Sequence, residues 1–162
     1  MKRIIFILLC SFGSLISCGD DDSSSASTPD SNLSVKIDNT DFVFDDISVV
    51  RTPYEDEGIA YVDIYVTAKL SSNPNREFQF YLDELQVGAN EVLYFMYEKD
   101  QVLYEFSGYQ PSEDTAVMSS NVMENTGSRV KGTFSGNLTN YNSTTMLYES
   151  VTVTNGSFDV WY

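Results

Sequence analysis

Aromatic side chains on the polar side of predicted strands are the residues of this sequence best suited to bind a ligand. Tyr61 and Tyr65 share the polar side of an alternating segment, 59–70, and Tyr81 has the same place in a second segment. Trp161, the only tryptophan, falls out of phase with the apolar residues around it. Because sugar rings pack on aromatic rings and phenols also hydrogen-bond, these residues predict a glycan-binding platform. Ordinary cross-strand pairing, or a loop that covers this face, would explain the same pattern.

Acidic side chains cluster in the predicted turns, where they could bind a cation. The clusters are Asp45-Asp46, Glu55-Asp56-Glu57, Asp83-Glu84 and Glu113-Asp114. Calcium takes several oxygen ligands, and neighbouring carboxylates of one loop can supply them. The turn of Glu55, Asp56 and Glu57 is our leading calcium site, and it does not match an EF-hand loop. A solvated acidic turn without a metal is the alternative.

The sequence contains no histidine, and cysteine occurs only at Cys10 and Cys18. This composition excludes zinc, copper and haem sites with His or Cys ligands, Ser-His-Asp triads and Cys-His pairs. The enzyme chemistries that survive are a carboxylate pair, a Ser-Lys pair and a hard-cation site. A carboxylate-dependent glycoside hydrolase is the most concrete of them, but no pattern selects two among the 24 acidic residues. We therefore expect a protein that is not an enzyme and has no cofactor other than calcium.

The N-terminal segment has the features of a bacterial lipoprotein signal peptide. Lys2 and Arg3 precede an apolar run that is too short to span a bilayer as a permanent helix. Leu15-Ile16-Ser17-Cys18 resembles the lipobox, in which a small residue precedes a cysteine that is lipidated and becomes the new N-terminus. We expect residues 1–17 to be removed and Cys18 to carry diacylglycerol and an N-acyl lipid. A short anchor with an incidental cysteine is the alternative.

Residues 18–31 lack large apolar side chains and are rich in serine and aspartate. Such a segment cannot bury enough surface to offset its ordering entropy, so we expect a disordered tether. Its acidic run, Asp20-Asp21-Asp22, resembles the surface-export signal of Bacteroidetes lipoproteins. This resemblance implies a lipid-anchored protein of the cell envelope, on the outer face of the outer membrane. A run that only improves solubility is the alternative.

The charge of the chain limits its partners. The formal net charge is −15, and removal of Lys2 and Arg3 with the signal peptide leaves −17. A surface this acidic repels phosphates, so nucleic acids and anionic lipid headgroups are excluded as partners. The partners that we expect are the membrane, through the lipid anchor, and a glycan or an outer-membrane protein.

A short motif marks a candidate site of covalent modification. Asp114-Thr115-Ala116 resembles the O-glycosylation motif of secreted Bacteroidetes proteins, and Thr115 lies in a predicted loop. Motifs of this length also arise by chance.

Alternation of apolar and polar residues dominates from residue 33 onward and predicts strands with one buried face. The predicted strands are 34–38, 42–50, 59–70, 78–82, 91–97, 101–106, 116–122, 130–138 and 151–162. Proline, glycine and asparagine clusters separate them, and no window predicts a long amphipathic helix. Leu85 and Val87 fall out of phase with the strand before them, which predicts a bulge near Asp83-Glu84. We expect residues 32–162 to form one all-β domain, an antiparallel β-sandwich or a barrel-like sheet.

Three segments carry a family resemblance: 35–42, 131–138 with its GTFSG motif, and 151–158 with its Asn155-Gly156 pair. They resemble a family of small Bacteroidetes lipoprotein domains of unknown function, which implies a β-sandwich-like fold and no activity. We expect Gly132 and Gly136 to let another backbone come close, and Gly156 to adopt a positive φ. Asn155-Gly156 indicates either a hairpin or a bulge within one long strand.

These observations lead to a ranked functional expectation. The first is a lipid-anchored, non-catalytic binding module for a glycan or an envelope protein. The second is a structural or assembly lipoprotein that docks on an outer-membrane partner through an apolar or aromatic face. A carboxylate-dependent glycoside hydrolase is a distant third.

Overall fold

The computed structural model describes residues 30–107 and 116–162, and every regular element in them is a β-strand. Within these residues there is no helix long and apolar enough to cross a membrane. The strands are β1 (Asn32–Ile37), β2 (Thr40–Phe44), β3 (Asp46–Asp56), β4 (Ile59–Leu70), β5 (Asn73–Asp83), β6 (Gly88–Ala89), β7 (Val92–Lys99), β8 (Val102–Ser107), β9 (Val117–Asn125), β10 (Arg129–Asn142) and β11 (Leu147–Trp161). All of their pairings are antiparallel, which confirms the predicted all-β fold class.

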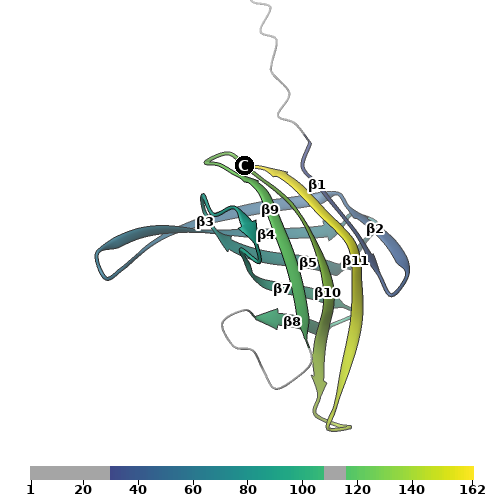
Figure 1. The fold of residues 1–162 in the computed structure, drawn as a ribbon. Coiled ribbons are helices and arrows are strands. Elements are labelled where there is room, and N and C mark those ends of the chain that lie inside the picture. The colour runs from purple at the N-terminus through teal and green to yellow at the C-terminus, as the bar shows by residue number, and fades with distance from the viewer. Residues whose placement is uncertain (1–29, 108–115) are drawn as a thin grey trace, which may run out of the picture.

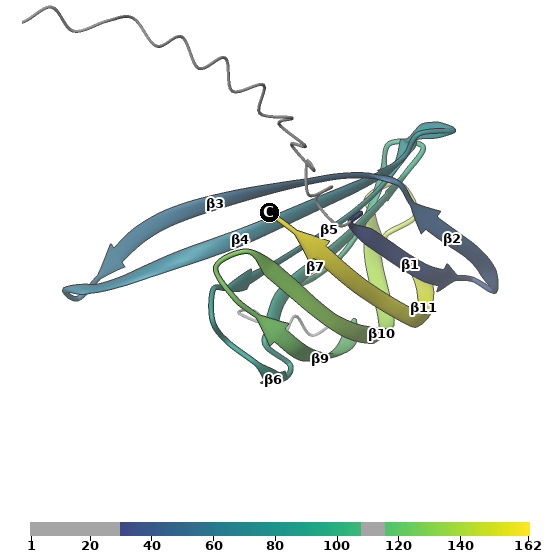
Figure 2. The same cartoon turned by 90° about the horizontal axis from the view of Figure 1, so that it is seen from above.

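The strands form one continuous sheet that folds over on itself (Figure 1). Its main order is β2-β1-β11-β10-β8-β7-β5-β4-β3, with β2 and β3 at the two ends, and β9 branches from β10 and also pairs with the short β6. β10 changes partners along its length, because residues 130–137 pair with β9 whereas Thr139 pairs with Glu105 of β8. The result is a sandwich-like arrangement in which β3, β4, β5 and β7 form one layer and β1, β11, β10 and β9 form the other (Figures 1 and 2).

The core between the two layers is built mainly from phenylalanine rings. Phe78 of β5 lies 5.1 Å from Phe134 of β10, measured between ring centroids, and Phe95 of β7 lies 5.3 Å from the same ring. Phe80 of β5 lies 4.7 Å from Phe158 of β11. All five rings are buried. These contacts hold the layers together, because tilted aromatic pairs add to the free energy gained from burying apolar area.

The prediction of one strand over residues 42–50 is wrong. β2 ends at Phe44 and β3 begins at Asp46, so the strand is interrupted at Asp45. The Asp45 carboxylate accepts hydrogen bonds from the Ser71 amide at 2.8 Å and the Ser71 hydroxyl at 2.6 Å. The Asp45 amide donates to the Lys69 carbonyl at 3.2 Å. These bonds hold the pKa of Asp45 below its usual value and fix the point at which the chain passes from one edge of the sheet to the other.

Residues 147–161 form one strand, so the Asn155-Gly156 pair is a bulge and not a hairpin turn. Opposite it, Phe134 pairs with Gly156 and Gly136 pairs with Val153, which leaves an extra residue on β11. The positive φ belongs to Asn155, at 53°, and not to Gly156 as expected. Gly156 is needed for space instead, because a Cβ there would lie 2.5 Å from the Phe134 ring.

The predicted bulge near Asp83-Glu84 is also different in the structure. β5 ends at Asp83, and a turn with Leu85 at a φ of 67° follows it. The Glu84 amide donates to the Val62 carbonyl at 2.8 Å, which attaches this turn to β4. The irregularity in the β5–β7 ladder lies two residues earlier, between Tyr81 and Leu82.

The outer half of the β3–β4 hairpin projects from the body of the sheet (Figures 1 and 2). We call residues 50–60 the arm; all of them are exposed. Its two-residue loop is Glu57-Gly58, with φ angles of 50° and 82°. Such a loop makes Asp56 and Ile59 a hydrogen-bonded pair. From there along β3 and β4, pairs that exchange backbone hydrogen bonds alternate with pairs that do not.

Pro53 blocks one position of the open edge of β3. It lies opposite Val62, which is a non-bonded pair in this alternation, so the Pro53 nitrogen faces the open edge. The Val62 carbonyl is bonded to Glu84 on the far side of β4, in agreement with this assignment. A proline at such a position removes a donor that another strand could use, which protects an edge from pairing.

We expect Pro53→Val to promote self-association of the full-length protein in detergent, because it adds an outward N–H and a β-branched side chain to the edge strand. Sedimentation velocity should show a concentration-dependent dimer. Thr52→Val is the matched control, since the Thr52 amide already faces β4. Equal sedimentation of both variants and the unchanged protein would contradict this role of Pro53.

Candidate functional site

The structure brings the predicted tyrosines together on the outer face of the β3-β4-β5-β7 layer. Tyr65 of β4 lies directly opposite Tyr81 of β5, with ring centroids 5.1 Å apart and ring planes 21° apart. Tyr61 lies four residues from Tyr65 along β4, with Asp63 between them on the same face, and it stacks on Tyr54 of β3 with ring centroids 5.1 Å apart. Alternation places these rings opposite the buried side chains of the same strands, as expected from the sequence.

Two members of this group were not predicted. Tyr54 extends it to β3, and Tyr94 of β7 extends it in the other direction, 6.3 Å from Tyr81. We call Tyr54, Tyr61, Tyr65, Tyr81 and Tyr94 the tyrosine face. Tyr94 occupies a polar-side position of the predicted strand 91–97, and that alternation was its only signal. Tyr54 lies beyond the predicted strand 42–50, in a segment that the structure shows as part of β3. Which strands are neighbours depends on the register, which the alternation does not reveal.

Stacking between the tyrosines determines which parts of their rings a ligand can contact. A ring that stacks on its cross-strand neighbour has one side occupied by that neighbour, so the group is not a flat platform. Tyr54 and Tyr65 are 38% and 42% exposed, enough for ring edges and phenol groups to meet a ligand. The face therefore combines apolar ring edges with hydroxyl groups that can donate and accept hydrogen bonds.

Carboxylates lie beside the rings. Asp63 accepts a hydrogen bond from the Tyr65 hydroxyl at 3.2 Å, and the Tyr94 hydroxyl donates to Glu105 at 3.0 Å. Partial burial, followed by the hydrogen bond to Glu105, raises the pKa of Tyr94. The Tyr94 hydroxyl is therefore a neutral hydrogen-bond donor at physiological pH.

Asp63 and Asp83 form a pair of like charges at the centre of the tyrosine face. They lie opposite each other in the β4–β5 ladder. Burial raises the pKa of Asp83, and the charge and hydrogen-bonding of Asp63 add to this rise, followed by the charge of Glu91. The Oδ1 atom of Asp83 is buried without a hydrogen-bond partner. The folded structure therefore destabilises the ionised form of Asp83.

The same pair bears on the glycoside hydrolase alternative. Two catalytic carboxyl groups must stand about 5 Å or more apart so that a sugar fits between them. Asp63 and Asp83 instead face each other directly across the β4–β5 ladder, where the Cβ atoms of facing residues lie about 5 Å apart. The two carboxyl groups therefore leave little room between them for a sugar ring.

Replacing Asp83 with asparagine should raise the midpoint temperature of thermal unfolding by a few degrees at pH 7. The folded protein has the higher Asp83 pKa, so at neutral pH the ionised carboxyl destabilises the native state. Below the unfolded pKa of about 4 the carboxyl is protonated in both states, so the gain should vanish there. Thermal unfolding at pH 7 and at about pH 3, below the unfolded pKa, measures this, with Asp56→Asn on the arm as the control. A gain that persists at the lower pH would contradict the charge explanation.

Trp161 is not part of the tyrosine face, because it lies on β11 in the other layer. The Arg129 guanidinium lies 4.5 Å from the centre of the indole ring. Arg129 also donates to Asp159 at 2.8 and 2.7 Å and to Glu124 at 2.8 Å. Its charge and hydrogen bonds hold the pKa of Asp159 below its usual value. Trp161 therefore belongs to a separate cluster at the end of β10 and β11.

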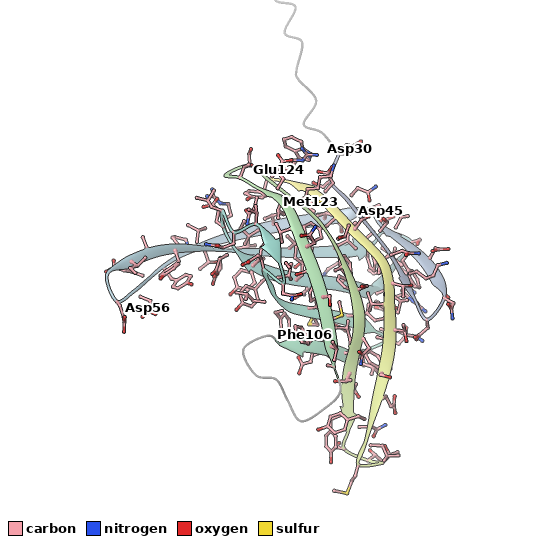
Figure 3. The ribbon with its side chains drawn as sticks, in the orientation of Figure 1. Asp30, Asp45, Asp56, Phe106, Met123 and Glu124 are labelled. Carbon is pink, nitrogen blue, oxygen red and sulfur yellow. The ribbon has the colours of Figure 1, made fainter. Side chains whose placement is uncertain are left out.

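The predicted calcium turn, Glu55, Asp56 and Glu57, is the tip of the arm (Asp56 in Figure 3). Its side chains are exposed to solvent. Among residues 30–107 and 116–162, no three Asp, Glu, His or Cys side chains are placed to hold a metal ion together. The structure therefore adds no ligand geometry to the calcium prediction. Cys18 and Thr115 lie outside the described residues.

A polar groove on the second layer was missed by sequence reasoning. It has a volume of about 640 Å³ and lies on the outer side of β9, β10 and β11. Its outward side chains are hydroxyls and amides: Ser119, Asn121, Thr133, Ser135, Thr154, Asn155 and Ser157. We call it the hydroxyl groove. Alternating Ser, Thr and Asn in the predicted strands was the available signal, but each strand alone resembles an ordinary solvated face.

Comparison with protein families, with curated proteins and with solved structures finds no match to this chain. The functional argument therefore depends on the geometry and chemistry of its own residues.

Proposed function

We propose that this protein is a lipid-anchored binding module of the cell envelope and that its tyrosine face binds a glycan. The observation that carries the proposal is the stacked pair Tyr65–Tyr81, with the Asp63 carboxylate bonded to the Tyr65 hydroxyl. Sugar hydroxyls need acceptors and donors close together, and sugar C–H groups need apolar contacts. Side chains of both kinds lie within one layer.

The location rests on residues before the domain. A positive start, a short apolar run and the Ser17-Cys18 step support a lipid anchor, and the acidic run after Cys18 supports display at the outer surface. The first strand begins at Asn32, which leaves a serine-rich segment to act as the tether. A lipid anchor would hold the tyrosine face within reach of polymers outside the cell.

Charge limits the glycans that this face would accept. Asp63, Asp83 and Glu105 lie among or beside the rings, and the chain as a whole has a formal net charge of −15. An anionic polysaccharide would be repelled. The ligand class that we propose for the tyrosine face is a neutral or amino-containing glycan.

The test is retardation of the full-length protein, in detergent, on native gels that contain a polysaccharide. We expect Tyr65→Ala and Tyr81→Ala each to weaken binding about tenfold, a loss of about 1.4 kcal/mol, as for a central aromatic contact. The panel is galactomannan, xyloglucan and chitosan, with polygalacturonate as the anionic polymer. Val43→Ala, at an exposed apolar position of β2 outside both proposed sites, is the control. Unchanged retardation of both variants on every gel that retards the parent protein would contradict this site, as would a parent protein that none of the gels retards.

The arm favours the docking lipoprotein as a second candidate. Val50 and Ile59 are 60% and 55% exposed, and the outer part of the arm is a two-stranded ribbon, because β5 pairs with β4 only from Asp63 onward. An isolated ribbon is only marginally stable in water, and a partner surface would stabilise it. Under this candidate, replacing both Val50 and Ile59 with serine should abolish association with an outer-membrane protein and leave glycan binding intact, because neither residue belongs to the tyrosine face.

A further inference from the structure

The second layer carries an extended surface without charge. In the sequence, residues 117–123 of β9, 132–142 of β10 and 150–158 of β11 contain no Asp, Glu, Lys or Arg. Elsewhere the chain is strongly acidic, with 24 acidic and 9 basic residues. These three strands lie side by side, so their outer sides form one continuous uncharged area (Figure 1).

The floor of this area is formed by hydrogen-bonding side chains. Thr133 pairs with Asn121 on one side and Ser157 on the other, and the next outward residue, Ser135, pairs with Ser119. These residues line the hydroxyl groove. The Ser157 hydroxyl is 2.9 Å from that of Ser34, so the polar row continues onto β1. Hydroxyls and amides both donate and accept, which matches the hydroxyl groups of a sugar chain.

Aromatic side chains stand at both ends of this area. At one end is Trp161, on the same side of β11 as Ser157 and four residues further along. Asp159 lies between them on that side, in ion pairs with Arg129 and Lys131, so the uncharged area stops just short of the indole ring. At the other end, Tyr141 and Tyr148 pair across β10 and β11 with ring centroids 5.0 Å apart, and each is 48% exposed. With a rise of about 3.3 Å per residue, Tyr148 and Trp161 are roughly 40 Å apart.

We propose that the outer side of β9, β10 and β11 is a second binding site, for a neutral glycan chain that lies in the hydroxyl groove and extends toward the aromatic residues at its ends. Lack of charge favours an uncharged ligand, because the acidic surface around the groove would repel an anionic ligand and would itself attract a cationic one away from the groove. Hydroxyl-rich walls favour a sugar polymer over an apolar partner, which would leave these groups without hydrogen bonds. This site is separate from the tyrosine face and does not depend on it.

The lone tryptophan provides a direct readout for this site. Trp161 is the only tryptophan in the chain and lies on the proposed surface, whereas the tyrosine face is in the other layer. We expect xyloglucan or galactomannan, added to the full-length protein in detergent, to shift the Trp161 emission. Polygalacturonate should not shift it. The same neutral polymers should retard the protein on native gels.

Substitutions separate this site from the tyrosine face. Ser135→Arg should fill the groove and weaken gel retardation about tenfold, and Tyr148→Ala should weaken it to a smaller extent. Ser48→Arg on β3 is the matched control, because Ser48 is an exposed serine of the other layer. Since arginine in the groove could disturb folding, each variant is first compared by thermal unfolding, and Tyr148→Ala gives a second test at an exposed position. The emission shift should persist in Tyr65→Ala.

Three results would overturn the proposal. The first is that neither neutral polymer shifts Trp161 emission or retards the protein. The second is a folded Ser135→Arg protein that binds as the unchanged protein does. The third is a loss of the emission shift in Tyr65→Ala, which would place all binding on the tyrosine face. The proposed function of the tyrosine face would survive the first two results if chitosan binding still required Tyr65 and Tyr81.

Discussion

Replacing Gly136 with alanine should lower the free energy of unfolding by about 3 kcal/mol, the upper range for an overpacked core. A Cβ at this position would lie 2.0 Å from the Val117 carbonyl oxygen and 2.8 Å from the Met118 Cα. Both are backbone atoms of β9, so no side-chain rotation can relieve the contact. The φ of Gly136, 149°, adds backbone strain for any residue with a side chain. The variant can fold only if β9 moves away from β10.

Chemical denaturation of the full-length protein in detergent measures this change, and two other glycines separate its causes. Gly58→Ala keeps a positive φ but a Cβ there has no atom within 4 Å, so it measures the backbone strain alone. Gly127→Ala has neither problem, because its nearest contact is Glu84 Oε1 at 4.0 Å. The expected order of destabilisation is Gly136, then Gly58, then Gly127. A Gly136→Ala protein as stable as Gly127→Ala would contradict the close approach of β9 and β10.

Replacing Cys18 with serine should move the whole protein from the membrane fraction to the soluble fraction. Under the lipid-anchor proposal, the acyl chains on Cys18 are the attachment, and each buried CH₂ contributes about 0.8 kcal/mol. Serine has no thiol to accept diacylglycerol, so the anchor and the cleavage that follows it are lost together. Cell fractionation and immunoblotting measure the distribution, and the variant should also run at a higher apparent mass.

Cys10→Ser is the matched control for this experiment. Cys10 is the only other cysteine and lies in the segment that we expect to be removed, so its replacement should leave the protein on the membrane. A Cys18→Ser protein that still fractionates fully with membranes would contradict the lipid anchor. Release of both variants would show that the signal segment itself, and not lipidation, was damaged.

Most strands could be predicted because each has one buried face and one face exposed to solvent, which makes apolar and polar residues alternate along it. Residues 59–70 show this, since the predicted segment and β4 have the same bounds. The prediction failed at Asp45, where the apolar positions change phase from Phe42 and Phe44 to Ile47 and Val49, because such a change also fits a bulge within one strand. The interruption depends on hydrogen bonds to Ser71 and Lys69, which are distant in sequence, and no local pattern carries that information.

The candidate sites show the same limit. Tyr65 and Tyr81 were predicted on polar faces, and the structure stacks them because β4 and β5 are neighbours in a particular register. Trp161 was predicted to join them because it is out of phase with the apolar residues around it, but it lies on β11 in the other layer. The hydroxyl groove went unnoticed because Asn121, Thr133 and Ser157 become neighbours only through strand pairing.

The pairing of the first strand with the last has a consequence for biogenesis. Asn32 of β1 lies opposite Asp159 of β11, and the Ser31 hydroxyl accepts a hydrogen bond from the Trp161 amide. A chain that emerges N-terminus first from a ribosome or a translocation channel can pair β1 with β2 at once, but it lacks the second partner of β1 until β11 is out. Contacts between residues so distant in sequence form slowly, because the loop between them must first close. This topology therefore delays completion of the layer that contains β1 and β11 until β11 has left the ribosome or the channel.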